Sequence, residues 1–287
     1  MPCSNISLQF RITLNSDAMK RSFIILTALL SLIFLSSCEK VIDLDLDEGA
    51  KKYVIEAVIT DQAGTAKVLL SHTKKFEDDN SFSGIAGATV TITESGGATT
   101  VLVPASPGVY EAPSLTGTSG KTYTLSVSVG GQVFTAVSKM PQKINLDTIY
   151  ITDEFLFTDT RKIVNAVFDD PVGLGNSYRF VQYVNGTKED QVMIRNDEYS
   201  DGRHIINKLF YFTDDEDDER NIRSGDHVSI DMQCIDPAVY KYWFSLDRSA
   251  TGGSGQATPS NPVTNLQGGA LGYFSAHTLQ TRMMVVP

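Results

Sequence analysis

Strict alternation of apolar and hydroxyl-bearing residues most constrains how this 287-residue chain can fold. It is clearest in Ala88–Thr93 (ATVTIT) and Tyr123–Val129 (YTLSVSV), where every second side chain is apolar. A period of two places the apolar residues on one face of a β-strand, so such strands are half buried. Because no helical period interrupts them, residues 51–141 are predicted to be a succession of short strands.

Two Gly-Gly pairs separate strands in this region. Gly96-Gly97 follows the strand at 88–94, and Gly130-Gly131 joins the strand at 123–129 to the one at 133–137. Two-residue hairpin turns require positive φ, which glycine adopts without steric cost, so both pairs predict such turns. About seven strands in about ninety residues predict an antiparallel sandwich of immunoglobulin-like size, an architecture that carries no function by itself.

A second series of strands begins near Ile144, so residues 142–287 are predicted to be a second β-rich domain. One helix near 237–248 interrupts it, because Asp236-Pro237 offers an N-cap followed by proline at the first helical position. A last pair of strands, 272–276 and 282–286, is expected to close the sheet. The predicted fold class is mainly β, with two antiparallel sandwich-like domains, the second containing one helix.

Four aromatic residues gather on the predicted helix: Tyr240, Tyr242, Trp243 and Phe244. They could form a binding platform. The favoured interpretation is a stripe that docks the helix on a sheet, because apolar residues at helical spacing most often face a core.

The N-terminal segment has the features of an export signal. Lys20 and Arg21 precede the apolar run 23–35 (FIILTALLSLIFL), which is too short to span a bilayer and ends at Ser36-Ser37-Cys38. Small residues before a cysteine resemble the lipobox of bacterial lipoproteins, in which the thiol takes a diacylglycerol. Residues 19–37 are therefore predicted to be a lipoprotein signal peptide, and Cys38 the lipid-anchored first residue; an ordinary signal peptide with a chance cysteine is the alternative.

The residues on either side of this signal also carry predictions. Export signals begin close to their basic region, so Met19 is the expected start and residues 1–18 a misassigned extension. Residues 38–50 are acidic and are expected to form an extended tether. Acids just after the lipidated cysteine resemble the surface-export signal of Bacteroidota lipoproteins, although Lys40 interrupts them. The predicted location is the outer membrane, on either its periplasmic or its cell-surface face.

Charge and cysteine content narrow the functional classes. A net charge of −10 and a pI near 4.9 argue against nucleic acid as a partner. Of three cysteines, Cys3 leaves with the leader and Cys38 takes lipid, so Cys234 has no intramolecular partner. Cys234 continues the alternating run 228–234, which predicts an inert thiol on the buried face of a strand.

No catalytic residue, cofactor or metal site is predicted. The four histidines lie on separate predicted strands without a zinc-binding spacing, so the chain is not expected to be an enzyme. Asp214, Asp215 and Asp217, within the acidic run 214–219, are weak Ca²⁺ candidates. A solvated hairpin tip is the favoured interpretation, because the run lacks the spacing of a calcium loop.

Several stretches resemble a known family. Residues 240–243 (YKYW) and, after a Gly/Ser/Pro loop, 261–274 (NPVTNLQGGALGYF) resemble the end of Bacteroidota lipoproteins grouped as domain-of-unknown-function family 4249. The stretches 169–171 (DDP) and 201–203 (DGR) are similar to further landmarks of that family. The resemblance implies an envelope lipoprotein, often found beside TonB-dependent outer-membrane receptors, with no established activity.

Together, these features predict a lipid-anchored, non-catalytic binding protein that is an accessory to a TonB-dependent outer-membrane receptor. One alternative is an envelope hydrolase with an unrecognised site, which would bring His204, His227 and acidic side chains into one cleft. The other is a structural or adhesive surface protein, for which long repeats would be the signal, and the sequence shows none.

Overall fold

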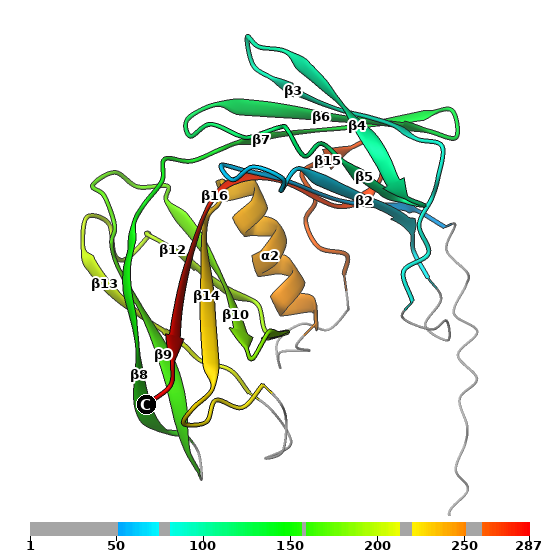
Figure 1. The fold of residues 1–287 in the computed structure, drawn as a ribbon. Helices are drawn as coiled ribbons and strands as arrows, with labels where there is room; N and C mark the ends of the chain where they lie inside the picture. Colours follow the sequence, from blue (N-terminus) through cyan, green and yellow to red (C-terminus); the bar gives the residue numbers. More distant parts are fainter. Residues whose placement is uncertain (1–50, 75–80, 157–158, 213–219, 251–259) are drawn as a thin grey trace, which may run out of the picture. The chain divides into compact units, whose positions relative to one another are not determined.

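The computed structural model describes residues 51–74, 81–156, 159–212, 220–250 and 260–287. This part of the chain is mainly β, with sixteen strands and one helix, which confirms the predicted fold class (Figure 1). Residues 49–287 form one compact unit. No helix among the described residues has the length and apolar character needed to cross a bilayer.

The first sandwich has two layers that enclose a hydrophobic core. One layer has the strand order β16-β1-β2-β5 and the other β4-β3-β6-β7-β15. β4 pairs with β3 through its first residues and with β5 through its last, so it passes between the layers. The consecutive strands of the first sandwich are β1 (Tyr53–Thr60), β2 (Lys67–His72), β3 (Thr89–Glu94), β4 (Thr99–Ser106), β5 (Val109–Glu111), β6 (Thr122–Val129) and β7 (Gln132–Lys139).

The alternation in sequence decides which side chains fill this core. Tyr123, Leu125 and Val127 of β6 are fully buried, whereas the hydroxyl-bearing residues between them lie on the opposite face. Burying one such large apolar side chain stabilises the fold by about 1.5–3 kcal/mol relative to leaving it exposed. The local pattern therefore fixes both the strand and its orientation.

The two Gly-Gly pairs form different turns. Gly130 and Gly131 both have positive φ and connect β6 directly to β7, which confirms the two-residue turn. The prediction for Gly96-Gly97 is wrong, because the loop between β3 and β4 has four residues and only Gly96 has positive φ. A hydrogen bond from Gly97 N to Glu94 O closes this wider loop at 2.9 Å.

The second sandwich places a sheet built on β10, β14 and β16 opposite the three-stranded sheet β13-β9-β8. β11 and β12 both pair with β10. Its strands are β8 (Leu146–Leu156), β9 (Asp159–Asp169), β10 (Ser177–Val184), β11 (Thr187–Lys188), β12 (Met193–Asn196), β13 (His204–Leu209) and β14 (His227–Cys234).

One long strand, β16 (Leu271–Val285), belongs to both sandwiches. Its first part runs parallel to β1 as far as His277, and its second part runs antiparallel to β14 from Thr278. The prediction of two separate strands at 272–276 and 282–286 is therefore wrong. β15 (Leu266–Gln267) extends the layer that contains β7, so the end of the chain helps to build the first sandwich as well as the second.

The helix α2 (Pro237–Ala250) begins as the sequence predicts. Asp236 Oδ1 accepts hydrogen bonds from the backbone N–H groups of Ala238 (2.9 Å) and Val239 (3.0 Å), which makes Asp236 the N-cap. Asp236 Oδ2 also accepts a hydrogen bond from Ser138 Oγ on β7. The cap therefore joins the helix of the second region to a strand of the first.

Candidate functional site

Four of the predicted site residues lie outside the described residues. They are Cys38, the predicted lipidation site, and the weak calcium candidates Asp214, Asp215 and Asp217. Both hypotheses stay predictions.

The hydrolase alternative requires His204 and His227 to meet in one cleft. His204 begins β13, where its Nδ1 lies 2.6 Å from Asp169 Oδ1 in an exposed pair. His227 begins β14, in the opposite sheet of the second sandwich. Neither residue lines either of the two clefts described below, so the structure does not bring this combination together there.

Cys234 lies on the buried face of β14, as the alternation predicts, and is 2 % exposed. Burial raises the pKa of its thiol. A thiol kept protonated and away from solvent is a poor nucleophile, so Cys234 acts as a packing residue.

The aromatic residues of α2 divide between two roles. Tyr242 is buried and its ring lies 4.8 Å from that of Tyr273 on β16, while Trp243 covers the Arg179 guanidinium at 3.8 Å. These contacts confirm core docking for Tyr242 and Trp243. Burial raises the pKa of Tyr273 to about 12 and lowers that of Arg179, whose Nη1 donates to Gln233 Oε1 at 3.1 Å.

A different pair of aromatic residues lies on the outer side of the helix. The rings of Tyr240 and Phe244 stack at 6.0 Å, and Phe244 is 42 % exposed. The Arg248 guanidinium lies 4.9 Å from the Phe244 ring. Tyr240, Phe244 and Arg248 therefore form a surface ridge along the helix.

Three carboxylates that sequence reasoning did not connect meet in the second sandwich. Ligand atoms of Asp170, Asp197 and Asp201 lie within 4.8 Å of one another, with the first two residues buried. Carboxylate oxygens suit hard cations such as Ca²⁺ or Mg²⁺. The stretches DDP and DGR place two of these residues in the sequence, but no local spacing indicates that their loops meet.

Backbone N–H groups already occupy much of this cluster. Asp197 accepts from Gly175 N (3.1 Å) and Asn176 N (2.9 Å), and Asp201 Oδ1 accepts from Gly173 N (2.6 Å). Asp170 Oδ2 accepts from Gly202 N at 3.1 Å, and its Oδ1 accepts from the Tyr178 hydroxyl. These bonds hold the loops after β9 and β12 together, which is a structural role.

One cleft of about 480 Å³ opens beside β8 and β9. Its lining mixes charges of both signs with one buried aromatic side chain, Tyr211. The Lys162 ammonium is paired with Asp153 at 3.2 Å, so part of this charge is internally compensated. The lining residues are Asp153, Asp159, Thr160, Arg161, Lys162, Tyr211, Asn221, Ile222 and Arg223.

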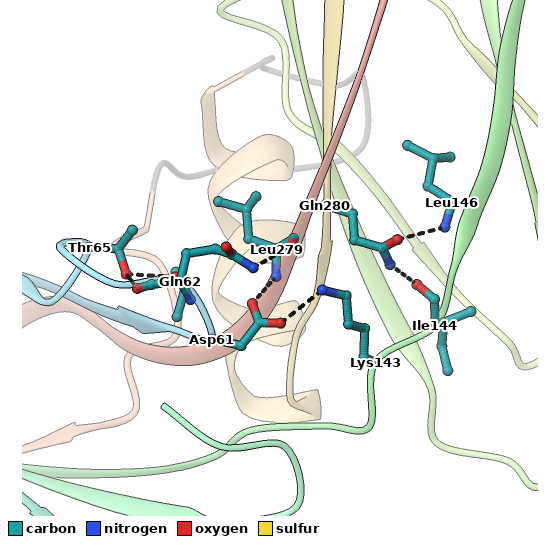
Figure 2. Close-up of polar contacts among 9 residues, drawn as sticks. Asp61, Gln62, Thr65, Lys143, Ile144, Leu146, Leu279 and Gln280 are labelled. Atoms are coloured by element: carbon teal, nitrogen blue, oxygen red, sulfur yellow. Dashed lines mark hydrogen bonds and ion pairs between the residues drawn. The ribbon is translucent and has the colours of Figure 1, made fainter. Parts of the chain in front are cut away.

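A second cleft, of about 390 Å³, lies where the two sandwiches join and is lined by Gln62, Lys143, Leu279, Gln280, Thr281 and Arg282. Figure 2 shows the polar contacts beside it. Asp61, just after β1, accepts from Leu279 N at 2.8 Å and from Lys143 Nζ at 3.1 Å.

On the other side of the same junction, the Gln280 side chain donates to Ile144 O and accepts from Leu146 N. Residues of β16 are thus tied to the end of β1 and to the start of β8. Basic side chains at the cleft could attract an anionic group, but the observed contacts chiefly fix the junction between the two sandwiches.

Comparison with protein families identifies the chain. The model of the family described as "Domain of unknown function (DUF4249)" matches residues 39–282, which is most of the sequence. The chain belongs to that family. No curated protein matches it.

In this DUF4249 chain, the C-terminal stretch 261–274 has a clear structural task. Gly272 has φ near +99°, and a Cβ at this position would lie 2.0 Å from Ile55 O on β1. Asn265 also holds β16 in place, because its side chain accepts a hydrogen bond from Phe274 N at 3.0 Å and donates one to Phe274 O at 2.8 Å. Gly272 and Asn265 therefore help to bring β16 against β1.

Proposed function

We propose that this protein is a lipid-anchored envelope protein of Bacteroidota that acts by binding, as an accessory to a TonB-dependent outer-membrane receptor. The observation that carries the anchor is the order of features in the sequence. Lys20 and Arg21 precede the apolar run 23–35, which ends at Ser36-Ser37-Cys38. A basic region, a short apolar run and small residues before a cysteine resemble the signal of a bacterial lipoprotein.

The fold supports a binding role through the contacts that join its two sandwiches. Both sandwiches share β16, and Asp61, Lys143 and Gln280 tie the strands on either side of the junction. A body with little freedom at its joint loses little conformational entropy when it docks on a partner. The resemblance to envelope lipoproteins often found beside TonB-dependent outer-membrane receptors supplies the proposed partner.

Two measurements test this function. Metabolic labelling with a clickable palmitate analogue should label the wild-type protein and not Cys38→Ser, and an unlabelled wild-type chain that retains its leader would refute the anchor. Affinity purification from native membranes solubilised in mild detergent should recover a TonB-dependent receptor with the wild-type protein. Recovery of no such receptor would refute the accessory role.

A further inference from the structure

The long strand β16 has a paired strand on each edge, but not over the same residues. β1 pairs with residues 271–277 and β14 with residues 278–285. Hydrogen bonds show which residues face which edge, because Phe274 N donates to Asn265 and Val286 N donates to Asp226 O, next to β14. Backbone groups point to alternate sides along a strand, so even-numbered residues face this edge and odd-numbered residues face β1.

The edge of β16 that binds β1 becomes unpaired soon after β1 ends. Asp61 Oδ1 accepts from Leu279 N at 2.8 Å, and Gln62 Nε2 donates to Leu279 O at 3.5 Å (Figure 2). These two side chains therefore complete the pairing of one residue beyond β1. The N–H and C=O groups of the next three odd-numbered residues have no hydrogen-bond partner in the part of the chain that the structure describes. They belong to the residues that we call the open edge: Thr281, Met283 and Val285.

The open edge can be reached from solvent. Thr281 is exposed, and Met283 and Val285 are 79 % and 55 % exposed. The cleft of about 390 Å³ at the junction is lined by residues 279–282, so it adjoins the first residue of the open edge. The Gln280 side chain contacts the start of β8, but β8 pairs only with β9 and leaves the edge of β16 unpaired.

An unpaired strand edge of this kind is a template for another strand. Its N–H and C=O groups recur at about 6.8 Å, a spacing that another extended polypeptide matches with groups of both kinds. Natural edges are usually protected by lysine, proline or a β-bulge. The three residues of the open edge are neither charged nor proline, and their register with β14 is unbroken.

The first half of β16 shows which occupant this edge accepts. There the same edge binds β1 as a parallel strand, through seven consecutive residue pairs from Val54 to Thr60. The chain turns away from β16 after Gln62, so the open edge continues the position that β1 occupied. A short extended segment of another polypeptide can take this position without any change in the backbone of β16.

Side chains next to the open edge favour an acidic segment. Lys143 and Arg282 line the cleft, and none of its lining residues is acidic. Lys143 is paired with Asp61 at 3.1 Å, whereas no described carboxylate forms a salt bridge with Arg282. Side chains alternate along the strand, so Met283 and Val285 lie on the face opposite Arg282. The best match is a segment with apolar side chains on one face and acidic side chains on the other.

Other occupants fit the open edge less well. A bilayer would leave its N–H and C=O groups without partners, which is costly in hydrocarbon. A second copy of the chain would bring together two proteins that each have a net charge of −10. A small anion could bind at Arg282, but it would not pair with the backbone of Met283 and Val285.

We infer that the open edge of β16 binds an extended, acidic segment of a partner protein by strand addition. About five residues of the segment hydrogen-bond to the backbone from Thr281 to Val285. The inference goes beyond the proposed function, because it requires neither the lipid anchor nor the receptor.

Peptide binding to the purified full chain tests the inference. The probe is a fluorescein-labelled peptide, Val-Thr-Val-Glu-Val-Glu with an amidated C-terminus, and the measurement is fluorescence anisotropy. We expect saturable binding below about 1 mM, and binding at least about tenfold weaker when lysine replaces both glutamates. Two further peptides are N-methylated at alternate residues. One should bind like the parent and the other should not bind, because only alternate N–H groups face β16.

Variants of the protein locate the binding. Met283→Pro removes an N–H group that points away from β14, so it spares the existing ladder and should weaken binding at least about tenfold. Met283→Ala keeps the N–H group and should change binding less than about threefold. Thermal unfolding checks that both variants fold.

Arg282→Glu should reverse the preference between the acidic and the lysine peptide. Lys188→Glu is the matched control, since it makes the same change of charge on β11, at the other end of the strand order β11-β10-β14-β16, and should leave the preference unchanged.

The remaining outcomes overturn the inference. They are the absence of saturable binding, equal binding of the two N-methylated peptides, and binding that Met283→Pro leaves intact. Light scattering that shows a dimer, converted to a monomer by Met283→Pro, would identify a second copy as the occupant and also overturn it. Receptor recovery is a separate measurement, so either proposal can fail while the other stands.

Discussion

The two sandwiches differ in how completely their buried polar side chains are hydrogen-bonded. In the first, Thr60 and Ser138 are buried, and both hydroxyls are hydrogen-bonded. The second encloses larger polar groups, several of which have atoms without a hydrogen-bond partner among the described residues. All of these lie between β9 and β12: Asn165, Arg179, Gln182, Glu189 and Arg195.

This difference indicates how each region is specified. A buried polar atom without a partner costs about 1–3 kcal/mol, so the second core carries penalties that the first avoids. The first is specified mainly by local alternation, and the second by long-range contacts and by β16. Four predictions test this contrast, from the largest expected effect to the smallest.

Gly272→Ala should have the largest effect, because its Cβ would collide with the Ile55 backbone where β16 meets β1. We expect a loss of at least about 3 kcal/mol in the free energy of unfolding. Urea unfolding followed by both Trp243 fluorescence and far-UV circular dichroism should show one transition, since both sandwiches share β16.

Gly269→Ala is the matched control, because Gly269 also has positive φ but no atom lies within 4 Å of its added Cβ. It should cost about 1 kcal/mol, from backbone strain alone. Equal losses for the two variants would contradict the close approach. Two separate transitions would show that the sandwiches unfold independently.

His277, where β16 passes between the sandwiches, should make stability depend on pH. Burial, with a smaller effect from Arg179, lowers its pKa from 6.5 to about 4, while Asp61 acts in the opposite direction. The unfolded chain therefore binds a proton that the folded chain excludes. Stability is retained above pH 6.5 and falls as pH decreases toward 4, by on the order of 3 kcal/mol in total.

The measurement is the free energy of unfolding at pH 7, 6 and 5 for wild type and His277→Asn. Asparagine can keep a hydrogen bond to Ser275, whose Oγ lies 2.8 Å from His277 Nδ1, but it does not titrate. The variant should lose less stability than wild type between pH 7 and 5. If the free energies of unfolding of wild type and His277→Asn fall in parallel with pH, a group other than His277 causes the pH dependence.

Asp236→Ala should cost about 2 kcal/mol, because it removes the helix N-cap and leaves the buried Ser138 hydroxyl without its acceptor. Asp236→Asn keeps a side-chain oxygen for the cap and should lose less than half as much. Urea unfolding measures both variants. If Asp236→Asn and Asp236→Ala lose equal free energy of unfolding, the charge at Asp236, rather than capping, stabilises the junction.

Gln182→Met should have the smallest effect and the opposite sign. Both polar atoms of the Gln182 amide are buried without a partner, so a methionine of similar volume should stabilise the protein by about 1 kcal/mol. Gln233→Met is the control, since its Oε1 accepts from Arg179 at 3.1 Å and its loss should destabilise. Destabilisation by Gln182→Met would show that this amide is satisfied in solution.

Much of the fold follows from short-range sequence patterns. The alternation in β3 and β6, the Gly130-Gly131 turn, the buried side of Cys234 and the Asp236-Pro237 helix start were all predicted, because each depends on a few neighbouring residues. The four-residue loop at Gly96 was missed because glycine permits several turns and pairing with β4 chooses among them.

The candidate sites were less predictable. The Asp170, Asp197 and Asp201 cluster joins two loops separated in sequence, and neither loop carries a spacing that indicates the other. The alternation predicts which side of each Ser/Thr-rich strand is exposed, but not which side chains lie beside one another, because β4, β3, β6 and β7 pair in one particular register.

By itself, the sequence determined the strand-forming segments, the face that each regular strand buries and the place where the helix begins, since backbone geometry and local hydrophobicity act over a few residues. The tertiary structure alone decided that residues 271–285 form one strand, with one half in each core. The physical reason is that no local signal distinguishes two short strands from one long one. That choice depends on the distant partners, β1 and β14, whose backbone groups must be hydrogen-bonded.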